Sequence, residues 1–342
     1  MANFGKIAVG LSGGVDSAVA VSLLRERGFE VVGVTMTLGR ADEAASLAVA
    51  RETAARLEVG LHVCDLSREW REGVLDYIRA TYLAGRTPNP CVRCNETVKF
   101  GLLPRFAFER LGCTHFATGH YARLAVENGV ARLFRGADRA KDQSYFLYRV
   151  PQAVLAQTVF PLGALTKAKV RERARALGLA AADRGDSQDF CGGDPMAVVS
   201  EGDRVGNIVT AEGKVLGRHR GFWHYTVGKR KGLGIGGGIP YYVTALRPKT
   251  NEVVVGYREA AVTRVFEVGD FVAFPGWGGR EDGLEVKVRS GGEPHGPCRV
   301  EPTEWGVRVT CPDGILGVAP GQSAVFYDGD EIVGGGVISA WG

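Results

Sequence analysis

The chain has 342 residues, of which 45% are hydrophobic, so it is long enough for two or three packed domains. No apolar run approaches the roughly 18 residues that a membrane-spanning helix needs, and no basic stretch followed by an apolar one opens the chain, so we expect a cytoplasmic protein without a membrane partner. The net charge of +4 is too small to indicate nucleic-acid binding by itself, and seven cysteines in a chain of this length do not predict a disulfide framework.

The first half of the chain alternates apolar runs with amphipathic stretches. We predict strands at Lys6–Leu11, Val31–Met36, Leu61–Cys64 and Thr114–Thr118, and helices at Val15–Arg27, at Ala41–Leu57, through Tyr82 and at Asn95–Leu111. Strands and helices alternating at these lengths predict an α/β fold with a doubly wound parallel sheet. Ligands of such sheets bind beyond the carboxyl ends of the strands.

The pattern changes near residue 200, where helical periodicity fades and glycines and short β-branched runs take over. Residues 206–256 predict a small β-rich module, and residues 262–338 predict a small barrel. The barrel strands are predicted at Phe266–Phe274, Glu285–Val288, Trp305–Thr310, Ser323–Tyr327 and Glu331–Ile338. We therefore predict a catalytic domain at 1–203, a central β-rich domain at 204–261 and a C-terminal β-barrel at 262–342.

The loop GLSGGVDS follows the first predicted strand and leads into the first predicted helix. Gly13 and Gly14 allow the backbone to approach an anion closely, and the positive end of the helix favours a phosphate there. No lysine stands where a Walker loop would place one, so transfer of a terminal phosphoryl group is not predicted. The pattern SGGxDS resembles the loop of the ATP pyrophosphatase superfamily, whose members adenylate a substrate and release pyrophosphate. Asp16 then implies a divalent cation, such as Mg²⁺, between its carboxylate and the phosphates.

Two cysteines stand three residues apart in the stretch TPNPCVRCN, just before a predicted helix. Cysteines near a helix N-terminus are often reactive, but a bare CxxC is also compatible with zinc, a redox pair or a cluster. A zinc ribbon would need a second pair, which the sequence lacks. A further cysteine, Cys191, lies between polar and glycine residues in SQDFCGG. We predict that Cys64 and Cys113 belong to the core, and we assign no role to Cys298 or Cys311.

Residues 213–251 contain no Asp or Glu but eight Lys or Arg, interleaved with aromatic side chains. A basic surface that carries aromatics suits an RNA backbone and its unstacked bases. A solvated basic face above core aromatics explains the same pattern, and the segment alone does not decide between the two.

Seven motifs occur in order along nearly the whole chain: SGGVDS, TPNPCVRCNE, ATGHYAR, KDQSYFL, SQDFCGG, YTVGKRKGLGIGGG and APGQSAVFYDGD. Together they resemble the tRNA-specific 2-thiouridylase family. The resemblance implies an adenine nucleotide α-hydrolase-like catalytic domain and an activity that replaces the C2 oxygen of the wobble uridine with sulfur in tRNAs for Lys, Glu and Gln. It also implies tRNA and a sulfur-donor protein, either a cysteine desulfurase or a relay protein, as partners.

The resemblance also implies site residues. Cys94 is the expected nucleophile and Cys191 the expected carrier of a persulfide. ATP is expected to bind at Gly10, Leu11, Ser12, Gly13, Gly14, Val15, Asp16, Ser17, Met36 and Gly119. Contacts with tRNA are expected from Asn89, Pro90, Cys91, His120, Lys141, Asp142, Gln143, Arg289 and Gln322. Taken without the resemblance, His120 is an ordinary hydrogen-bonded histidine, and Lys141 and Gln143 are surface residues.

The chemistry leaves alternatives open. Adenylation converts the uracil C2 oxygen into a good leaving group, and a cysteine persulfide can then deliver sulfur, which leaves a Cys94–Cys191 disulfide. Alternatively, Cys91, Cys94 and Cys191 form a three-thiolate set that holds an iron–sulfur cluster with one open iron. Other functions compatible with the loop are an ammonia-dependent synthetase and a non-enzymatic module that binds nucleotide, RNA or a cluster.

Overall fold

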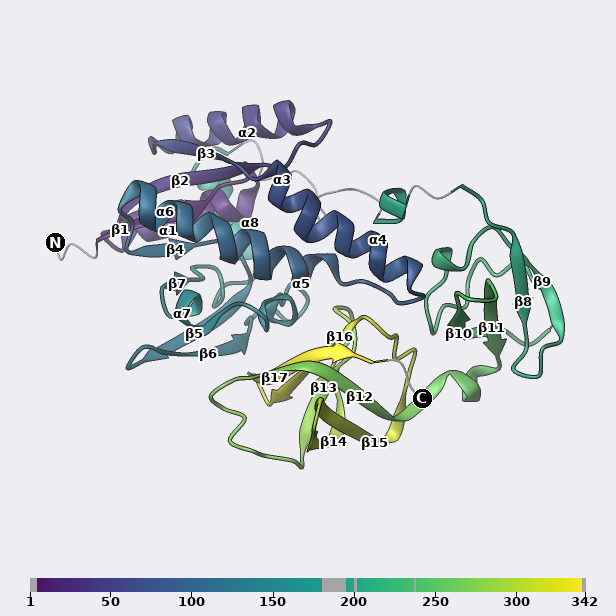
Figure 1. Ribbon diagram of the computed structural model, residues 1–342. Coiled ribbons are helices and arrows are strands. Elements are labelled where there is room, and N and C mark those ends of the chain that lie inside the picture. The colour runs from purple at the N-terminus through teal and green to yellow at the C-terminus, as the bar shows by residue number, and fades with distance from the viewer. Residues whose placement is uncertain (1–4, 180–194, 200–201, 237, 340–342) are drawn as a thin grey trace. The chain divides into compact units, whose positions relative to one another are not determined.

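The computed structural model describes residues 5–179, 195–199, 202–236 and 238–339. The chain divides into two compact units (Figure 1). The first unit comprises residues 1–74, 91–192 and 330–332, and the second comprises residues 75–90, 193–329 and 333–342. Among the described residues, no helix is both long and apolar enough to cross a membrane. The three predicted domains stay a prediction.

A five-stranded parallel sheet forms the centre of the first unit, in the order β3-β2-β1-β4-β7. Its strands are β1 (Lys6–Gly10), β2 (Glu30–Thr37), β3 (Leu61–Asp65), β4 (His115–Ala117) and β7 (Thr158–Val159). The order runs outward in both directions from β1 and β4, so the prediction of a doubly wound α/β sheet is confirmed. The carboxyl ends of β1 and β4 are neighbours, because Val9 pairs with Ala117.

Helices connect these strands. They include α1 (Val15–Glu26), α2 (Glu43–Arg56), α3 (Ser67–Trp70), α7 (Gln152–Leu155) and α8 (Lys167–Ala176), while α4 (Asp76–Leu83) belongs to the second unit. One face of α1 packs into the main apolar cluster together with Ile7 and Val9 of β1 and Val170 and Ala174 of α8. This packing holds the start of α1 rigidly at the edge of the sheet.

The cysteine motif lies inside a helix and not before one, which corrects the prediction of a helix over Asn95–Leu111. The chain is helical from α5 (Pro90–Cys94) through a π-helical stretch (Asn95–Leu102) into α6 (Leu103–Leu111). Pro90 suits the first helical position because it needs no N–H partner there. Gly112 ends the helix at a φ of 65°. π-helical turns are rare and often mark functional sites.

The second unit contains a four-stranded sheet in the order β10-β11-β8-β9 and a six-stranded barrel. The sheet strands are β8 (Gly206–Val209), β9 (Val215–His219), β10 (Tyr242–Arg247) and β11 (Glu252–Gly256). The barrel strands are β12 (Val262–Ala273), β13 (Leu284–Lys287), β14 (His295–Thr303), β15 (Gly306–Leu316), β16 (Ser323–Asp328) and β17 (Glu331–Ile338). Because β12 pairs with both β15 and β17, the barrel closes, and the predicted C-terminal barrel is confirmed.

The structure differs from the predicted β structure in three details. Strand β14 was not predicted, because it contains two prolines and a proline in a sequence argues against a strand. Trp305 lies in the turn between β14 and β15, where it is 80% exposed. The antiparallel hairpin of β5 (Ala122–Glu127) and β6 (Val130–Arg135) in the first unit was also not predicted.

A disulfide joins Cys298 of β14 to Cys311 of β15, two residues to which the sequence assigned no role. Arg299 pairs with Thr310, so the two cysteines stand opposite each other across neighbouring strands, with their Cα atoms 4.5 Å apart. Both are buried in the apolar core of the barrel. The disulfide therefore crosslinks two strands that are already paired.

Candidate active site

The glycine-rich loop is held in one conformation by its own hydrogen bonds. The Ser17 hydroxyl donates to the Gly14 carbonyl oxygen at 3.1 Å, and the Gly14 amide donates to the Ser12 hydroxyl at 3.4 Å. Gly13 has a φ of 78°, and a Cβ there would lie 2.7 Å from Val49 Cγ1 on α2, so only glycine fits. The loop precedes a 12-residue helix, and this combination suits an anionic phosphate.

A buried lysine compensates the charge of the loop aspartate. Lys167 at the start of α8 donates to both carboxylate oxygens of Asp16 at 2.8 Å, and the Tyr121 hydroxyl donates to one of them, also at 2.8 Å. Lys167 is only 7% exposed, while the Asp16 side chain is 32% exposed. The sequence analysis missed Lys167, which lies 151 residues from Asp16 along the chain. The sequence around Lys167 indicates only that a helix begins there, with Thr166 as its N-cap.

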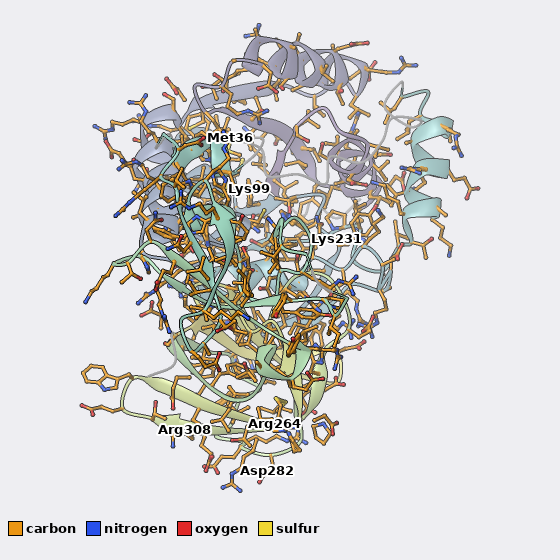
Figure 2. The ribbon with its side chains drawn as sticks, turned by 90° about the vertical axis from the view of Figure 1, so that its right-hand side faces the viewer. Met36, Lys99, Lys231, Arg264, Asp282 and Arg308 are labelled. Atoms are coloured by element: carbon orange, nitrogen blue, oxygen red, sulfur yellow. A yellow bond between two sulfur atoms is a disulfide. The ribbon has the colours of Figure 1, made fainter. Side chains whose placement is uncertain are left out.

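Gly119 lies directly against the loop. A Cβ on Gly119 would lie 2.8 Å from the Asp16 carbonyl carbon and 2.9 Å from the Ser17 amide nitrogen. The structure thus brings together the SGGVDS and ATGHYA motifs at the carboxyl ends of adjacent strands. Met36, the other residue predicted on the nucleotide side, lies near the end of β2 (Figure 2), where it pairs with Cys64 of β3.

His120 is a neutral histidine packed among aromatic rings. Its Nδ1 lies 2.7 Å from the Thr118 hydroxyl, and its ring lies 5.5 Å from that of Phe100 and 6.0 Å from that of Phe160. Burial, assisted by the positive charge of Lys99, lowers the pKa of His120 to about 3. The imidazole is therefore uncharged near neutral pH, and it offers no positive charge to an RNA phosphate.

This pKa predicts how stability depends on pH. Because the folded-state pKa of about 3 lies below the ordinary 6.5, His120 stabilises the fold fully above pH 6.5 and loses that stabilisation as the pH falls toward 3. We expect His120→Gln to remove this slope, which is at most about 1.4 kcal/mol per pH unit in that window. Urea unfolding of the full chain at pH 7.5, 5.5 and 4.5 measures it. Parallel profiles of wild type and variant would show that His120 titrates normally.

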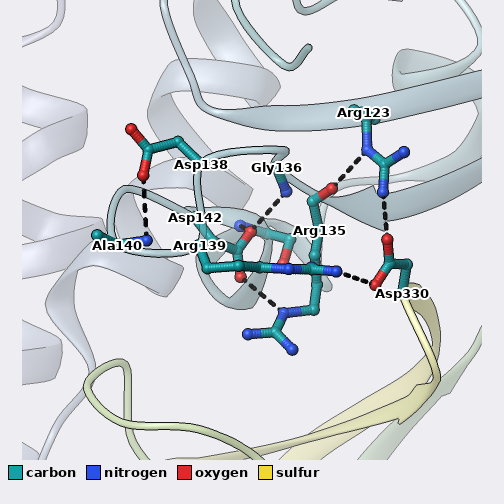
Figure 3. A network of polar contacts seen from close by, with 9 residues as sticks. Arg123, Arg135, Gly136, Asp138, Arg139, Ala140, Asp142 and Asp330 are labelled. Atoms are coloured by element: carbon teal, nitrogen blue, oxygen red, sulfur yellow. Dashed lines mark hydrogen bonds and ion pairs between the residues drawn. The ribbon is translucent and has the colours of Figure 1, made fainter. Parts of the chain in front are cut away.

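The predicted tRNA-contacting segment at residues 141–143 serves an internal network (Figure 3). The Asp142 side chain is 1% exposed, and its carboxylate accepts from the Gly136 amide at 3.0 Å and pairs with Arg135 at 3.5 Å. The Gln143 side chain accepts from the Tyr121 amide at 2.9 Å. These contacts place Tyr121 beside Asp16. The predicted RNA contact of this segment stays a prediction, and Lys141, the cation of the segment, is half-buried.

Cys91 and Cys94 lie in the first turn of the helix, and their spacing puts them on one face. Cys94 is 3% exposed and Cys91 is half-buried. Arg93 anchors this turn within the first unit by donating to the Gly73 carbonyl oxygen at 3.1 Å. Cys191, the second predicted catalytic residue, lies outside the described residues. The predicted Cys94–Cys191 pair and the predicted three-cysteine cluster therefore stay predictions.

Within the second unit, the motif APGQS forms hydrogen bonds with the backbone segment that leads into Cys91. The Gln322 amide donates to the Pro88 carbonyl oxygen at 2.6 Å, and the Thr87 amide donates to the Pro320 carbonyl oxygen at 2.8 Å. The Asn89 side chain, 7% exposed, donates to the Ser323 hydroxyl at 3.3 Å. The amide groups of Asn89 and Gln322, both predicted to contact tRNA, are thus engaged within the protein.

Arg289 is the remaining predicted tRNA contact. It is exposed in the segment after β13. Its positive charge assists burial in lowering the pKa of His295. The side chain is therefore accessible to a polyanion.

Three family models match successive parts of the chain. Residues 5–192 match the tRNA methyl transferase HUP domain, residues 200–257 the tRNA methyl transferase PRC-barrel domain, and residues 277–338 the aminomethyltransferase beta-barrel domain. The fold and the loop thus define a HUP-domain protein with two appended β domains. The chain belongs to the tRNA-specific 2-thiouridylase family, because curated members of that family are 40–41% identical to it over almost the full length.

Curated relatives match along almost the full length. The chain is 40% identical to tRNA-specific 2-thiouridylase MnmA of Endomicrobium trichonymphae and 41% identical to that of Nostoc punctiforme, and each match covers 97% of this chain and 98% of the relative. A solved U34-tRNA thiolase from Methanococcus maripaludis is 18% identical over 58% of this chain and 65% of that chain, with a TM-score of 0.38. The amidating and non-enzymatic alternatives receive no support from these relatives.

Proposed function

We propose that this chain is an enzyme that uses ATP to replace the C2 oxygen of the wobble uridine in tRNA with sulfur. The observation that carries the proposal is the full-length match to tRNA-specific 2-thiouridylases. The phosphate-binding loop and the helix-borne Cys94 provide the chemistry that such a reaction needs. The expected substrates are the tRNAs for Lys, Glu and Gln.

The loop would hold ATP so that the uracil C2 oxygen attacks the α-phosphorus and pyrophosphate leaves. Backbone amides at the start of α1 and the Lys167 ammonium would stabilise the negative charge that develops on the departing phosphates. Asp16 already accepts hydrogen bonds from Lys167 and Tyr121. Asp16 would be the loop residue that contacts a Mg²⁺ ion bound with ATP, and that ion would offset the negative charge of the phosphates.

Sulfur transfer would follow adenylation. The outer sulfur of a Cys191 persulfide attacks C2, the C–O bond breaks, and AMP leaves. The Cys94 thiolate then attacks the inner sulfur of Cys191, which releases the transferred sulfur as the uridine thiocarbonyl and leaves a Cys94–Cys191 disulfide. A dithiol reductant must return both cysteines to thiols before the next turnover. A cysteine desulfurase or a relay protein would load Cys191.

The alternative sulfur carrier is an iron–sulfur cluster on Cys91, Cys94 and Cys191. Cys91 and Cys94 share a helical turn, which is compatible with two cluster ligands. Anaerobic purification distinguishes the two carriers. Protein without iron or visible absorption that still forms 2-thiouridine would exclude the cluster.

The decisive experiment is nucleoside mass spectrometry of unthiolated tRNA incubated anaerobically with the protein, ATP, Mg²⁺, a cysteine desulfurase with its cysteine substrate, and a dithiol reductant. We expect 2-thiouridine together with AMP and pyrophosphate. AMP without a thiolated nucleoside would mean that the acceptor or the sulfur donor is different. The absence of both products would contradict the proposed function.

The hydrogen bond from Gln322 to Pro88 predicts that a Gln322 variant turns over more slowly. Gln322→Ala removes a donor to the Pro88 carbonyl oxygen, so the segment before Cys91 loses a positioning contact. We expect kcat for thiolation to fall roughly tenfold, which corresponds to one net hydrogen bond, with KM for tRNA nearly unchanged. Gln322→Glu, which has the same size but no donor, should behave in the same way. A raised KM with unchanged kcat would instead show that Gln322 contacts tRNA.

A further inference from the structure

Two tyrosines stack at one end of the four-stranded sheet in the second unit. Tyr241 immediately precedes β10 and Tyr257 immediately follows β11, and the pairing of Tyr242 with Gly256 brings them opposite each other. Their ring centroids are 5.0 Å apart at an angle of 18°, and their hydroxyl oxygens are 3.4 Å apart. The two rings are therefore nearly parallel and stacked on each other.

Burial does not explain this pair. The core beneath the sheet consists of other aromatic and aliphatic side chains, such as Phe222, Trp223 and Val243. Tyr241 packs only at its border. Tyr257 is 48% exposed, and Ile239, two residues before Tyr241, is 65% exposed. An aromatic ring that is about half exposed offers a face on which another planar ring can stack.

The neighbouring chain is basic. The segment after Thr226 runs alongside β10, since the Gly228 amide donates to the Val243 carbonyl oxygen at 2.8 Å and the Val243 amide donates to the Lys229 carbonyl oxygen at 3.0 Å. Arg230 and Lys231 follow directly and are both exposed (Figure 2 labels Lys231). Within the described part of the chain, neither Arg230 nor Lys231 takes part in an ion pair. Their charges thus remain available to an anionic partner.

We propose that Tyr241 and Tyr257 form a stacking platform for an unpaired base of tRNA, and that Arg230 and Lys231 bind the adjacent phosphates. This inference rests on the proposed function, which supplies the RNA. Single-stranded RNA is recognised by stacking of bases on aromatic rings together with cationic contacts to the backbone. The absence of any acidic residue from 213 to 251 favours an anionic occupant, and the exposed aromatic ring favours a nucleic acid, whose bases stack, over an acidic protein surface.

The test compares the affinity of unthiolated tRNA for the wild type, Tyr257→Ala and Tyr257→Phe. Stacking on one base is worth about 1–3 kcal/mol, so we expect Tyr257→Ala to raise Kd by roughly 5- to 100-fold. Tyr257→Phe keeps the ring and loses only the hydroxyl contact, so its Kd should stay within about twofold. Thermal unfolding of each variant verifies that the sheet is intact. Trp305→Ala is the matched control, because Trp305 is an exposed aromatic residue on the barrel.

A second measurement tests the phosphate contacts of Arg230 and Lys231 separately from base stacking. Replacing Arg230 and Lys231 together by alanine should lower the slope of log Kd against log salt concentration by about 2, one for each phosphate contact. Tyr257→Ala should leave that slope unchanged, because stacking releases no counterions.

Several results would overturn the platform. They are an unchanged Kd for Tyr257→Ala, an equal loss for Tyr257→Phe, or an equal loss for Trp305→Ala. If Tyr257→Ala abolishes capture of a protein while tRNA affinity is unaffected, the surface binds protein and not RNA. If the wild type neither binds nor thiolates tRNA, the proposed function fails as well. Thiolation by a wild type whose tRNA affinity does not depend on Tyr257 rejects the platform alone.

Discussion

Replacing Cys94 by serine is expected to abolish 2-thiouridine formation, by at least about 10³-fold, while ATP binding persists. Serine preserves the size of the buried side chain, which is 3% exposed in the wild type, but its hydroxyl cannot break a sulfur–sulfur bond at neutral pH. The loop that would hold ATP lies between β1 and α1, whereas Cys94 belongs to α5. Mass spectrometry of digested tRNA measures the product, and equilibrium binding of ATP measures the loop.

Cys113 provides the matched control for this prediction. It is also a buried cysteine of the first unit, and burial raises the pKa of its thiol, which makes it unreactive. Cys113→Ser should therefore retain thiolation, whereas Cys191→Ala should lose it as completely as Cys94→Ser. Near-normal thiolation by the Cys94 variant would reject the two-cysteine mechanism.

Replacing Lys167 by alanine is expected to reduce formation of AMP from ATP by about 10²- to 10³-fold, the usual effect of removing one donor to a developing negative charge. The variant also leaves the Asp16 carboxylate without the ammonium group that now lies 2.8 Å from each of its oxygens. Pyrophosphate release in the presence of tRNA measures the effect. Lys169→Ala is the control, because Lys169 is exposed on the same helix and should be dispensable.

A lost ion pair could also act by unfolding the site. The double variant Asp16→Asn, Lys167→Met distinguishes the two explanations, because it removes both charges and leaves no unpaired ion in the interior. We expect its thermal stability to exceed that of Lys167→Ala while its activity stays as low. Recovery of pyrophosphate release in the double variant would show that Lys167 is needed only for folding.

Features encoded by short stretches of sequence were predictable. The helix predicted over Val15–Arg27 is α1, which ends at Glu26 and is followed by Gly28 at a φ of 91°, a conformation that favours glycine after a helix. The loop before α1 was recognised from its glycines and serines, since their roles depend on neighbours within a few residues. The barrel was predicted from several short β-branched runs, although β14 was not, because its prolines obscure the strand pattern.

Features encoded by distant contacts were not predictable. Nothing near Lys167 in the sequence indicates that it pairs with Asp16, because the two meet only when α8 packs against α1. In the same way, Asn89, Asp142 and Gln322 are polar residues in motif-like stretches, where a surface role is the natural expectation. Their hydrogen bonds to Ser323, Gly136 and Pro88 form only when folding brings these partners next to them.

The disulfide between Cys298 and Cys311 has a practical consequence for enzymology. The proposed cycle needs a dithiol reductant at every turnover, and the same reagent can open this second disulfide in the barrel. Because both barrel sulfurs belong to side chains that are at most 3% exposed, they should react more slowly than a disulfide that must re-form in each cycle. A reductant titration should therefore restore thiolation at concentrations that leave the barrel disulfide closed.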